Sequence, residues 1–174
     1  MEDLWPENLV SAKERMPVEI LRDQAVLLGQ KTRNLLEGRV KRIEPSDMVG
    51  LGDFAWAFSI VSPALGNYSY RLFAIRYGAD VYPVTFDVEE VITQELPTWA
   101  PKLSKGNNRT LLAHSEAEFI EVVRAILGSE RTRKLIAAIL AQVTDPTDRP
   151  SSAGMNSISS EKTTSHSLNS EANP

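Results

Sequence analysis

The chain of 174 residues contains no cysteine and only two histidines. Without cysteine it can have no disulfide framework, no thiolate nucleophile and no zinc or iron–sulfur site with cysteine ligands. Of the two histidines, His166 falls in a Ser/Thr/Pro-rich tail and His114 precedes a predicted helix cap. One histidine without an assignable carboxylate partner is typical of a surface or capping residue. We therefore predict no catalytic residue, no metal and no cofactor.

Long apolar runs are missing as well. No stretch approaches the roughly 20 apolar residues that a helix needs to cross a bilayer. The first residues, MEDLWPENLVSAKERM, lack the basic start and apolar run of a signal peptide. The net charge of −4, from 23 acidic and 19 basic residues, argues against a chain-wide attraction to nucleic acid or to anionic membranes. The simplest expected location is the cytoplasm.

The composition changes twice along the chain, which predicts three zones. Residues 1–16 read as a polar N-terminal extension, and residues 17–143 as a single α+β domain. Residues 144–174 are rich in serine, threonine and proline. Such a segment buries too little apolar surface to offset its loss of conformational entropy, so we expect it to be disordered.

Three segments have the spacing of amphipathic helices. Residues 17–32 start with Pro17, which suits the first helical position, and carry apolar residues three and four apart. Near the C-terminus, Ser115 and Glu118 form a capping-box pattern before one apolar stripe. Ser129 is placed to cap a further helix directly after it.

Four segments between these helices have the patterns of strands. They are NLLEGRVKRIEP, FAWAFSIV, YSYRLFAIRY and VYPVTFDV. Their short connections require antiparallel neighbours. Pro83 cannot donate to a ladder, so its strand is an edge or its nitrogen points away from a partner. The order α-β-β-β-β-α-α predicts an antiparallel four-stranded meander with an N-terminal helix and two C-terminal helices packed on one face.

The faces of the sheet decide which side chains a partner could reach. The period of two in FAWAFSIV places Trp56 and Phe58 in the core, facing the helices. In the next strand, Phe73 and Ile75 best match that bulky face, which would turn the alternate residues outward. One reading is an ordinary half-apolar surface. The other is a surface for a protein partner or a homodimer, formed by Tyr68, Tyr70, Leu72, Arg76 and Pro83.

Two charged patterns suggest other chemistry, and we interpret both as solvated surface. Asp87, Glu89 and Glu90 are the densest acidic residues near a strand end, and Asp87 and Glu89 could share a face and bind a hard cation. A nuclease-like site would also need a lysine close on the same strand. Basic residues cluster in 31–42 and in 131–134, and nearby tyrosines could stack on single-stranded nucleic acid. Helix ends favour basic residues in any case, and the net charge is negative. We predict no nucleic-acid partner.

The segments SPALGNYSYRLFAIRY and YPVTF, followed by EAEFIEVVRAILGSERTRKLIAAILAQ, resemble small bacterial α+β proteins of uncharacterised function. The resemblance covers about residues 17–143 and implies no particular activity. We predict a non-enzymatic protein-interaction module, of immunity, antitoxin or chaperone type by analogy of fold. The alternative is an enzyme or small-ligand-binding protein with a pocket between the sheet and the 96–110 loop.

Overall fold

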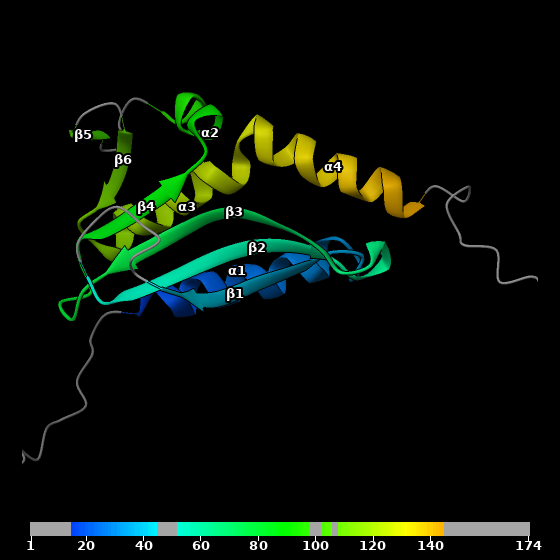
Figure 1. Ribbon diagram of the computed structural model, residues 1–174, viewed down its shortest axis with the longest axis horizontal. Helices are drawn as coiled ribbons and strands as arrows, with labels where there is room; N and C mark the ends of the chain where they lie inside the picture. Colours follow the sequence, from blue (N-terminus) through cyan, green and yellow to red (C-terminus); the bar gives the residue numbers. More distant parts are fainter. Residues whose placement is uncertain (1–14, 45–51, 98–101, 106–107, 145–174) are drawn as a thin grey trace, which may run out of the picture.

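The computed structural model describes residues 15–44, 52–97, 102–105 and 108–144, and Figure 1 draws the other residues as a thin grey trace. Most of the predicted N-terminal extension and nearly all of the predicted disordered tail lie outside these ranges. Disorder in the tail therefore stays a prediction.

The described chain is an α+β structure with an antiparallel sheet, as predicted. The sheet has six strands in the order β1-β2-β3-β4-β6-β5. In Figure 1, α1 lies behind β1 and β2, α3 lies behind the β4–β6 end of the sheet, and α4 extends from the end of α3. The elements are α1 (Pro17–Lys31), β1 (Glu37–Ile43), β2 (Phe54–Ser62), the 3-10 helix η2 (Pro63–Leu65), β3 (Tyr68–Tyr77), β4 (Val84–Val88), α2 (Glu90–Glu95), β5 (Lys102–Lys105), β6 (Asn108–Ala113), α3 (Glu116–Gly128) and α4 (Glu130–Thr144).

The predicted helices α1, α3 and α4 and the meander β1–β4 are confirmed. The sequence reading missed α2, β5 and β6, so the sheet is two strands wider than expected. Helix α2 has six residues, too short to show an amphipathic period. Strand β6 begins with Asn108 and Arg109, which read as loop.

The extra strands change the place of β4 in the sheet. It pairs with β3 on one side and with β6 on the other. Of the two readings given for the strand with Pro83, the edge position is therefore wrong. Pro83 lies directly before Val84, the first residue of β4, so its missing N–H is not required by the ladder of that strand.

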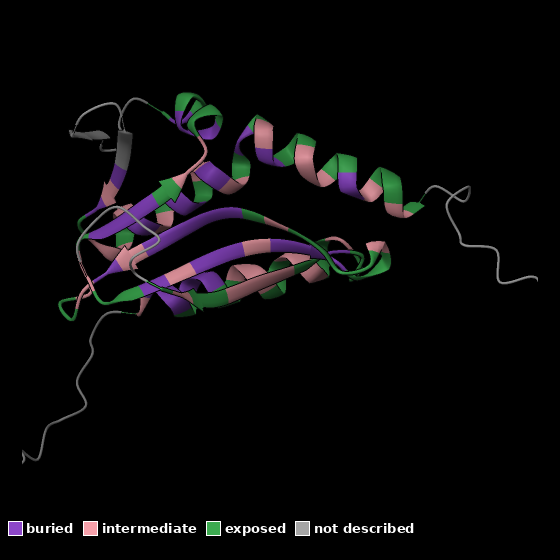
Figure 2. Ribbon diagram, viewed as in Figure 1, coloured by how far each residue is buried: buried purple, intermediate pink, exposed green. Residues whose placement is uncertain are grey.

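The main core lies between the sheet and the helices, and Figure 2 shows the buried stretches along β2 and β3. Phe58 of β2 stacks on Phe73 of β3 with ring centroids 5.3 Å apart. Phe86 of β4 packs on Phe119 of α3 at the same distance, 5.3 Å. The prediction that Phe58 is core is confirmed. Trp56 is only half-buried, at the border of the core.

A bulge in β3 overturns the predicted faces of that strand. Phe58 pairs with Phe73 but Ser59 pairs with Arg71, so Leu72 is an extra residue without a partner in β2. Leu72 is 1% exposed and belongs to the same core as Phe73. A bulge shifts the alternation of a strand by one residue. The expected outward orientation of Tyr70 and Leu72 is therefore wrong.

The opposite face of the sheet carries small side chains. Ala55, Ala57 and Ala74 are buried there, and Ile43 packs against them. Arg76 is on this face, where its Nε donates to the Gly52 carbonyl at 2.8 Å. Gly52 has a φ of +128°, a conformation that side chains rarely adopt.

Helix α1 approaches β1 closely at Gly38. A Cβ on Gly38 would lie 2.4 Å from the Cα of Ala25. We expect Gly38→Ala to lower the free energy of unfolding by about 1–3 kcal/mol, as overpacking does. Gly128→Ala is the matched control, because a Cβ there meets nothing within 4 Å. Urea unfolding of both variants measures the difference. Equal stability of the two variants would contradict the close contact.

Leu72 gives a second test, of the bulge. We expect Leu72→Ala to lower the free energy of unfolding by about 2–5 kcal/mol, as for other fully buried leucines. Tyr68→Ala, in the same strand but with an exposed side chain, should change it by less than about 0.5 kcal/mol. A loss below about 1 kcal/mol for Leu72→Ala would show that this residue points outward after all.

Candidate functional site

The structure does not bring the five predicted partner-binding residues onto one surface. Leu72 is core, and Tyr70 pairs with Ile60, on the side of β3 that faces the helices. Arg76 is half-buried on the opposite face. Tyr68 and Pro83 are exposed, one at the start of β3 and the other before β4. Partner binding by Tyr68, Arg76 and Pro83 stays a prediction.

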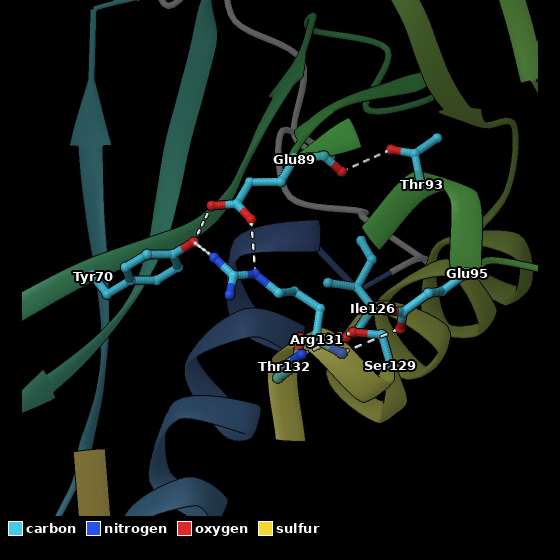
Figure 3. Close-up of polar contacts among 8 residues, drawn as sticks. All are labelled: Tyr70, Glu89, Thr93, Glu95, Ile126, Ser129, Arg131 and Thr132. Carbon is cyan, nitrogen blue, oxygen red and sulfur yellow. Dashed lines mark hydrogen bonds and ion pairs between the residues drawn. The ribbon is translucent and has the colours of Figure 1, made fainter. Parts of the chain in front are cut away.

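Tyr70 instead belongs to a polar cluster that joins three elements (Figure 3). Its hydroxyl donates to Oε1 of Glu89, which lies between β4 and α2. Arg131, in the first turn of α4, donates from Nε to Oε2 of Glu89 at 3.2 Å. Its Nη2 lies 3.5 Å from the Tyr70 hydroxyl. A phenol, a carboxylate and a guanidinium therefore contact one another in a closed triangle.

Local hydrogen bonds fix Glu89 and Arg131 in place. Thr93 donates to the Glu89 carbonyl at 3.1 Å, inside the first turn of α2. Ser129 accepts from the backbone N–H of Thr132 at 3.2 Å, as predicted for a helix cap. The backbone N–H of Arg131 donates to Glu95 at 3.2 Å. Both side chains therefore start from well-anchored helix ends.

The charges in the triangle stabilise one another. The hydrogen bond from Tyr70 is the main cause that lowers the pKa of Glu89, and Arg131 acts in the same direction. The pKa of Tyr70 is raised, first by burial and then by its hydrogen bond to Glu89. Both shifts favour the anionic carboxylate and the neutral phenol. We interpret the triangle as a structural clamp between the sheet and α4, because each member already has its partners.

The neighbouring acidic residues do not join Glu89. Asp87 pairs with Arg71 at 3.6 Å, and Glu90 accepts from Gln94 at 3.3 Å. Within the described residues, no three potential metal ligands come together. His114 is exposed, and its backbone N–H donates to the Glu118 side chain at 2.8 Å. Ser115 is confirmed as the N-cap, since it accepts from the Glu118 N–H at 3.3 Å, but the Glu118 side chain contacts the residue before the cap and not Ser115 itself.

Two surface hollows lie on the helical layer. One, of about 230 Å³, lies between α1 and α3 and is lined by Ile20, Gln24, Ile120, Val123, Arg124 and Leu127. The other, of about 460 Å³, lies between the end of α2 and the α3–α4 junction and includes Glu95, Glu130 and Arg133. The predicted pocket beside the 96–110 loop would need residues 98–110, whose side chains lie outside the described part of the chain.

A different surface, which the sequence reading missed, lies where α1 meets β1. Val26 of α1 is 61% exposed, and Leu35, two residues before β1, is 37% exposed. Ala25, next to Val26, contacts Gly38 of β1. β1 pairs only with β2, and no other strand of the described residues pairs with its second edge, which we call its open side. We call Val26, Leu35 and the open side of Glu37–Ile43 the α1–β1 edge.

One signal for this surface was present in the sequence. Val26 lies off the apolar stripe of α1, which includes Leu21, Ala25 and Leu28. A valine on the polar side of a helix has no part in the core that the stripe predicts. The edge position of β1 follows from the predicted meander, whose first strand has one neighbour, but the contact of α1 with β1 has no local signal in the sequence.

No protein-family model, curated protein or solved structure matches the chain. The resemblance to small bacterial α+β proteins stays an expectation. In the described part of the chain, no helix is long and apolar enough to cross a membrane.

The clamp gives a prediction for the pH dependence of stability. Because the pKa of Glu89 is lowered in the folded state, its contribution is present above its ordinary pKa of 4.5 and is lost as pH falls through the lower folded value. We expect Glu89→Gln to be less stable than the wild type at pH 7. The difference should be below about 1 kcal/mol, since the ion pair is partly exposed.

Urea unfolding at pH 7 and near pH 3 measures this effect, and the difference between wild type and Glu89→Gln should shrink at the lower pH. Glu90→Gln is the control, because Glu90 is exposed and outside the triangle. An equal loss for both variants, or a loss that does not change with pH, would contradict the assigned role of Glu89.

Proposed function

We propose that the protein is a non-enzymatic protein-binding module and that its contact surface is the α1–β1 edge. The observation that supports this proposal is the exposure of Val26 and Leu35 near β1, whose second edge pairs with no strand in the described part of the chain. Single exposed apolar side chains are ordinary in soluble proteins. Here they flank a strand whose backbone can take further hydrogen bonds, so a partner can gain apolar burial and backbone pairing together.

The free energy that a partner gains by burying these side chains fits a specific contact of modest affinity. Fully burying a valine or leucine side chain contributes about 1.5–3 kcal/mol. Val26 and Leu35 are already partly covered, so each offers a part of that value. Backbone pairing along β1 adds direction and register to this contact. Together they favour a protein chain over a small molecule as the occupant.

The net charge of −4 and the α+β fold are compatible with the expected type, an immunity, antitoxin or chaperone protein. Proteins of these types act by covering a surface of a partner and need no reacting group of their own. This part of the proposal rests on analogy of fold. The alternative, a ligand pocket beside the 96–110 loop, stays a prediction from the sequence.

A pair of matched variants tests the proposal. Val26→Arg places a charge on the α1–β1 edge, and Val91→Arg places one at a similarly exposed valine, 53% exposed, on α2. Tagged wild type and both variants are purified from the native cell after cross-linking, and bound proteins are identified by mass spectrometry. We expect a partner that is retained by Val91→Arg and lost at least about tenfold from Val26→Arg, because the arginine would be buried unpaired.

Circular dichroism provides the control for folding, since both positions are exposed and both variants should fold. A partner that binds the two variants and the wild type equally would show that the α1–β1 edge is not the contact surface. A wild-type protein that retains no partner at all would contradict the proposed function itself.

A further inference from the structure

The proposed function leaves the chemistry of the partner open, and the charges of β1 define it further. We propose that the open edge of β1 takes an extended, acidic segment of another protein as an additional strand of the sheet. This inference rests on the proposed function and names the class of partner. It depends on three features of β1: its length and its edge, with which no described strand pairs, its excess of basic side chains, and the side of α1 that lies beneath it.

The first feature is the backbone. β1 has seven residues, and all of them are in register with β2, from Glu37 opposite Val61 to Ile43 opposite Ala55. In an antiparallel pair, alternate residues direct their N–H and C=O groups to the partner, and the residues between direct theirs away from it. Part of the backbone of β1 therefore faces its open side. The opposite edge of the sheet, β5, has only four residues, so β1 offers the longer template.

The second feature is charge. β1 contains three cations, Arg39, Lys41 and Arg42, and one anion, Glu37. Arg39 lies 3.6 Å from Glu37, and the two side chains are 38% and 52% exposed. Lys41 and Arg42 make no ion pair with any other residue in the described ranges. The edge is therefore basic on a chain whose net charge is −4.

Cations on an edge strand also oppose self-association, which favours an acidic partner over a second copy. If two copies of β1 paired antiparallel about Val40, Arg39 of each would lie opposite Lys41 of the other. Like charges directly opposite each other destabilise a strand pair, whereas opposite charges stabilise it. Acidic side chains opposite Arg39 and Lys41 would form favourable charge pairs, whereas the cations of a second copy would repel them.

The third feature sets the pattern of the incoming segment. Arg39 and Lys41 lie opposite Ser59 and Ala57, on the side of the sheet away from α1. Val40 lies opposite Phe58 of the core, on the side of α1. Beneath that side, Ala25 contacts Gly38, and the next residue of α1 is the exposed Val26. The segment should therefore alternate acidic residues, facing Arg39 and Lys41, with apolar residues on the side of α1.

A defined set of peptides tests this inference. The probe is an eight-residue peptide of alternating glutamate and valine with a fluorescent label, and the charge control replaces each glutamate by lysine. Two further acidic peptides carry N-methyl groups, one on all glutamates and the other on all valines. In a strand only one of these sets of N–H groups faces the template, so a bound strand tolerates one methylation pattern and not the other.

Fluorescence anisotropy gives affinity, and amide hydrogen exchange gives the place of binding. We expect the acidic peptide to bind full-length protein at least about tenfold more tightly than the lysine peptide. Higher salt should weaken the binding, because these charges are exposed. Only one N-methylated peptide should bind, and the amides of β1 should gain protection. The double variant Arg39→Glu with Lys41→Glu should reverse the charge preference, and Arg133→Glu, an exposed position on α4, should not.

Circular dichroism checks that the charge variants fold, and Arg39→Gln with Lys41→Gln replaces the double variant if it does not. Equal binding of both N-methylated peptides, or equal binding of the acidic and lysine peptides, would overturn strand addition. If an oligothymidylate binds at Arg39 and Lys41 and the acidic peptide does not, these cations would be a phosphate-binding site. That result would also overturn the inference. If the native partner is still lost from Val26→Arg while β1 gains no protection, the proposed function stands and this inference falls.

Discussion

The extra residue in β3 determines which side chains of that strand reach the helices. Strand β3 faces the helices with Tyr77, Ile75 and Phe73, and a regular strand would continue with Arg71. The bulge at Leu72 instead puts Arg71 on the opposite face, where it pairs with Asp87. A regular strand would place a guanidinium in the core and a phenol in water, and burying that charge would be costly. The bulge thus separates one long strand into two segments that share a single apolar face.

The attachment of α4 follows from the same irregularity. Tyr70 faces the helices only because the bulge has shifted the alternation, and from there its hydroxyl reaches Glu89 and Arg131. Helix α4 has few fully buried residues, chiefly Thr132 and Ile139. Its first turn is therefore held largely by polar contacts, to Tyr70 and Glu89 through the side chain of Arg131 and to Glu95 through its backbone. The clamp and the helix cap at Ser129 fix where α4 leaves the domain.

Much of the fold could be predicted from the sequence, because the helices and β2 repeat their apolar residues with regular periods. The caps at Ser115 and Ser129 were equally clear, since their chemistry is local. The faces of β3 could not be predicted, because Leu72 looks like any other apolar residue and a bulge depends on pairing with β2. The alternation rule then assigned Tyr70 and Leu72 to the wrong side. The candidate surface was missed for a different reason: the predicted meander already leaves its first strand at an edge, but only the packing of Ala25 against Gly38 brings α1 and the exposed Val26 to that strand.

The contact between Ala25 and Gly38 has a consequence for how this protein can vary. The two residues leave no space between the backbones of α1 and β1, so the volume available there belongs to both positions jointly. A larger side chain at either position would lift the helix from the strand and, with it, move the valine that follows Ala25. A substitution in the interior would in this way alter the spacing between the helix and the strand edge at the surface. Substitutions at these two sites can therefore change which partner binds the α1–β1 edge, although neither residue needs to contact that partner.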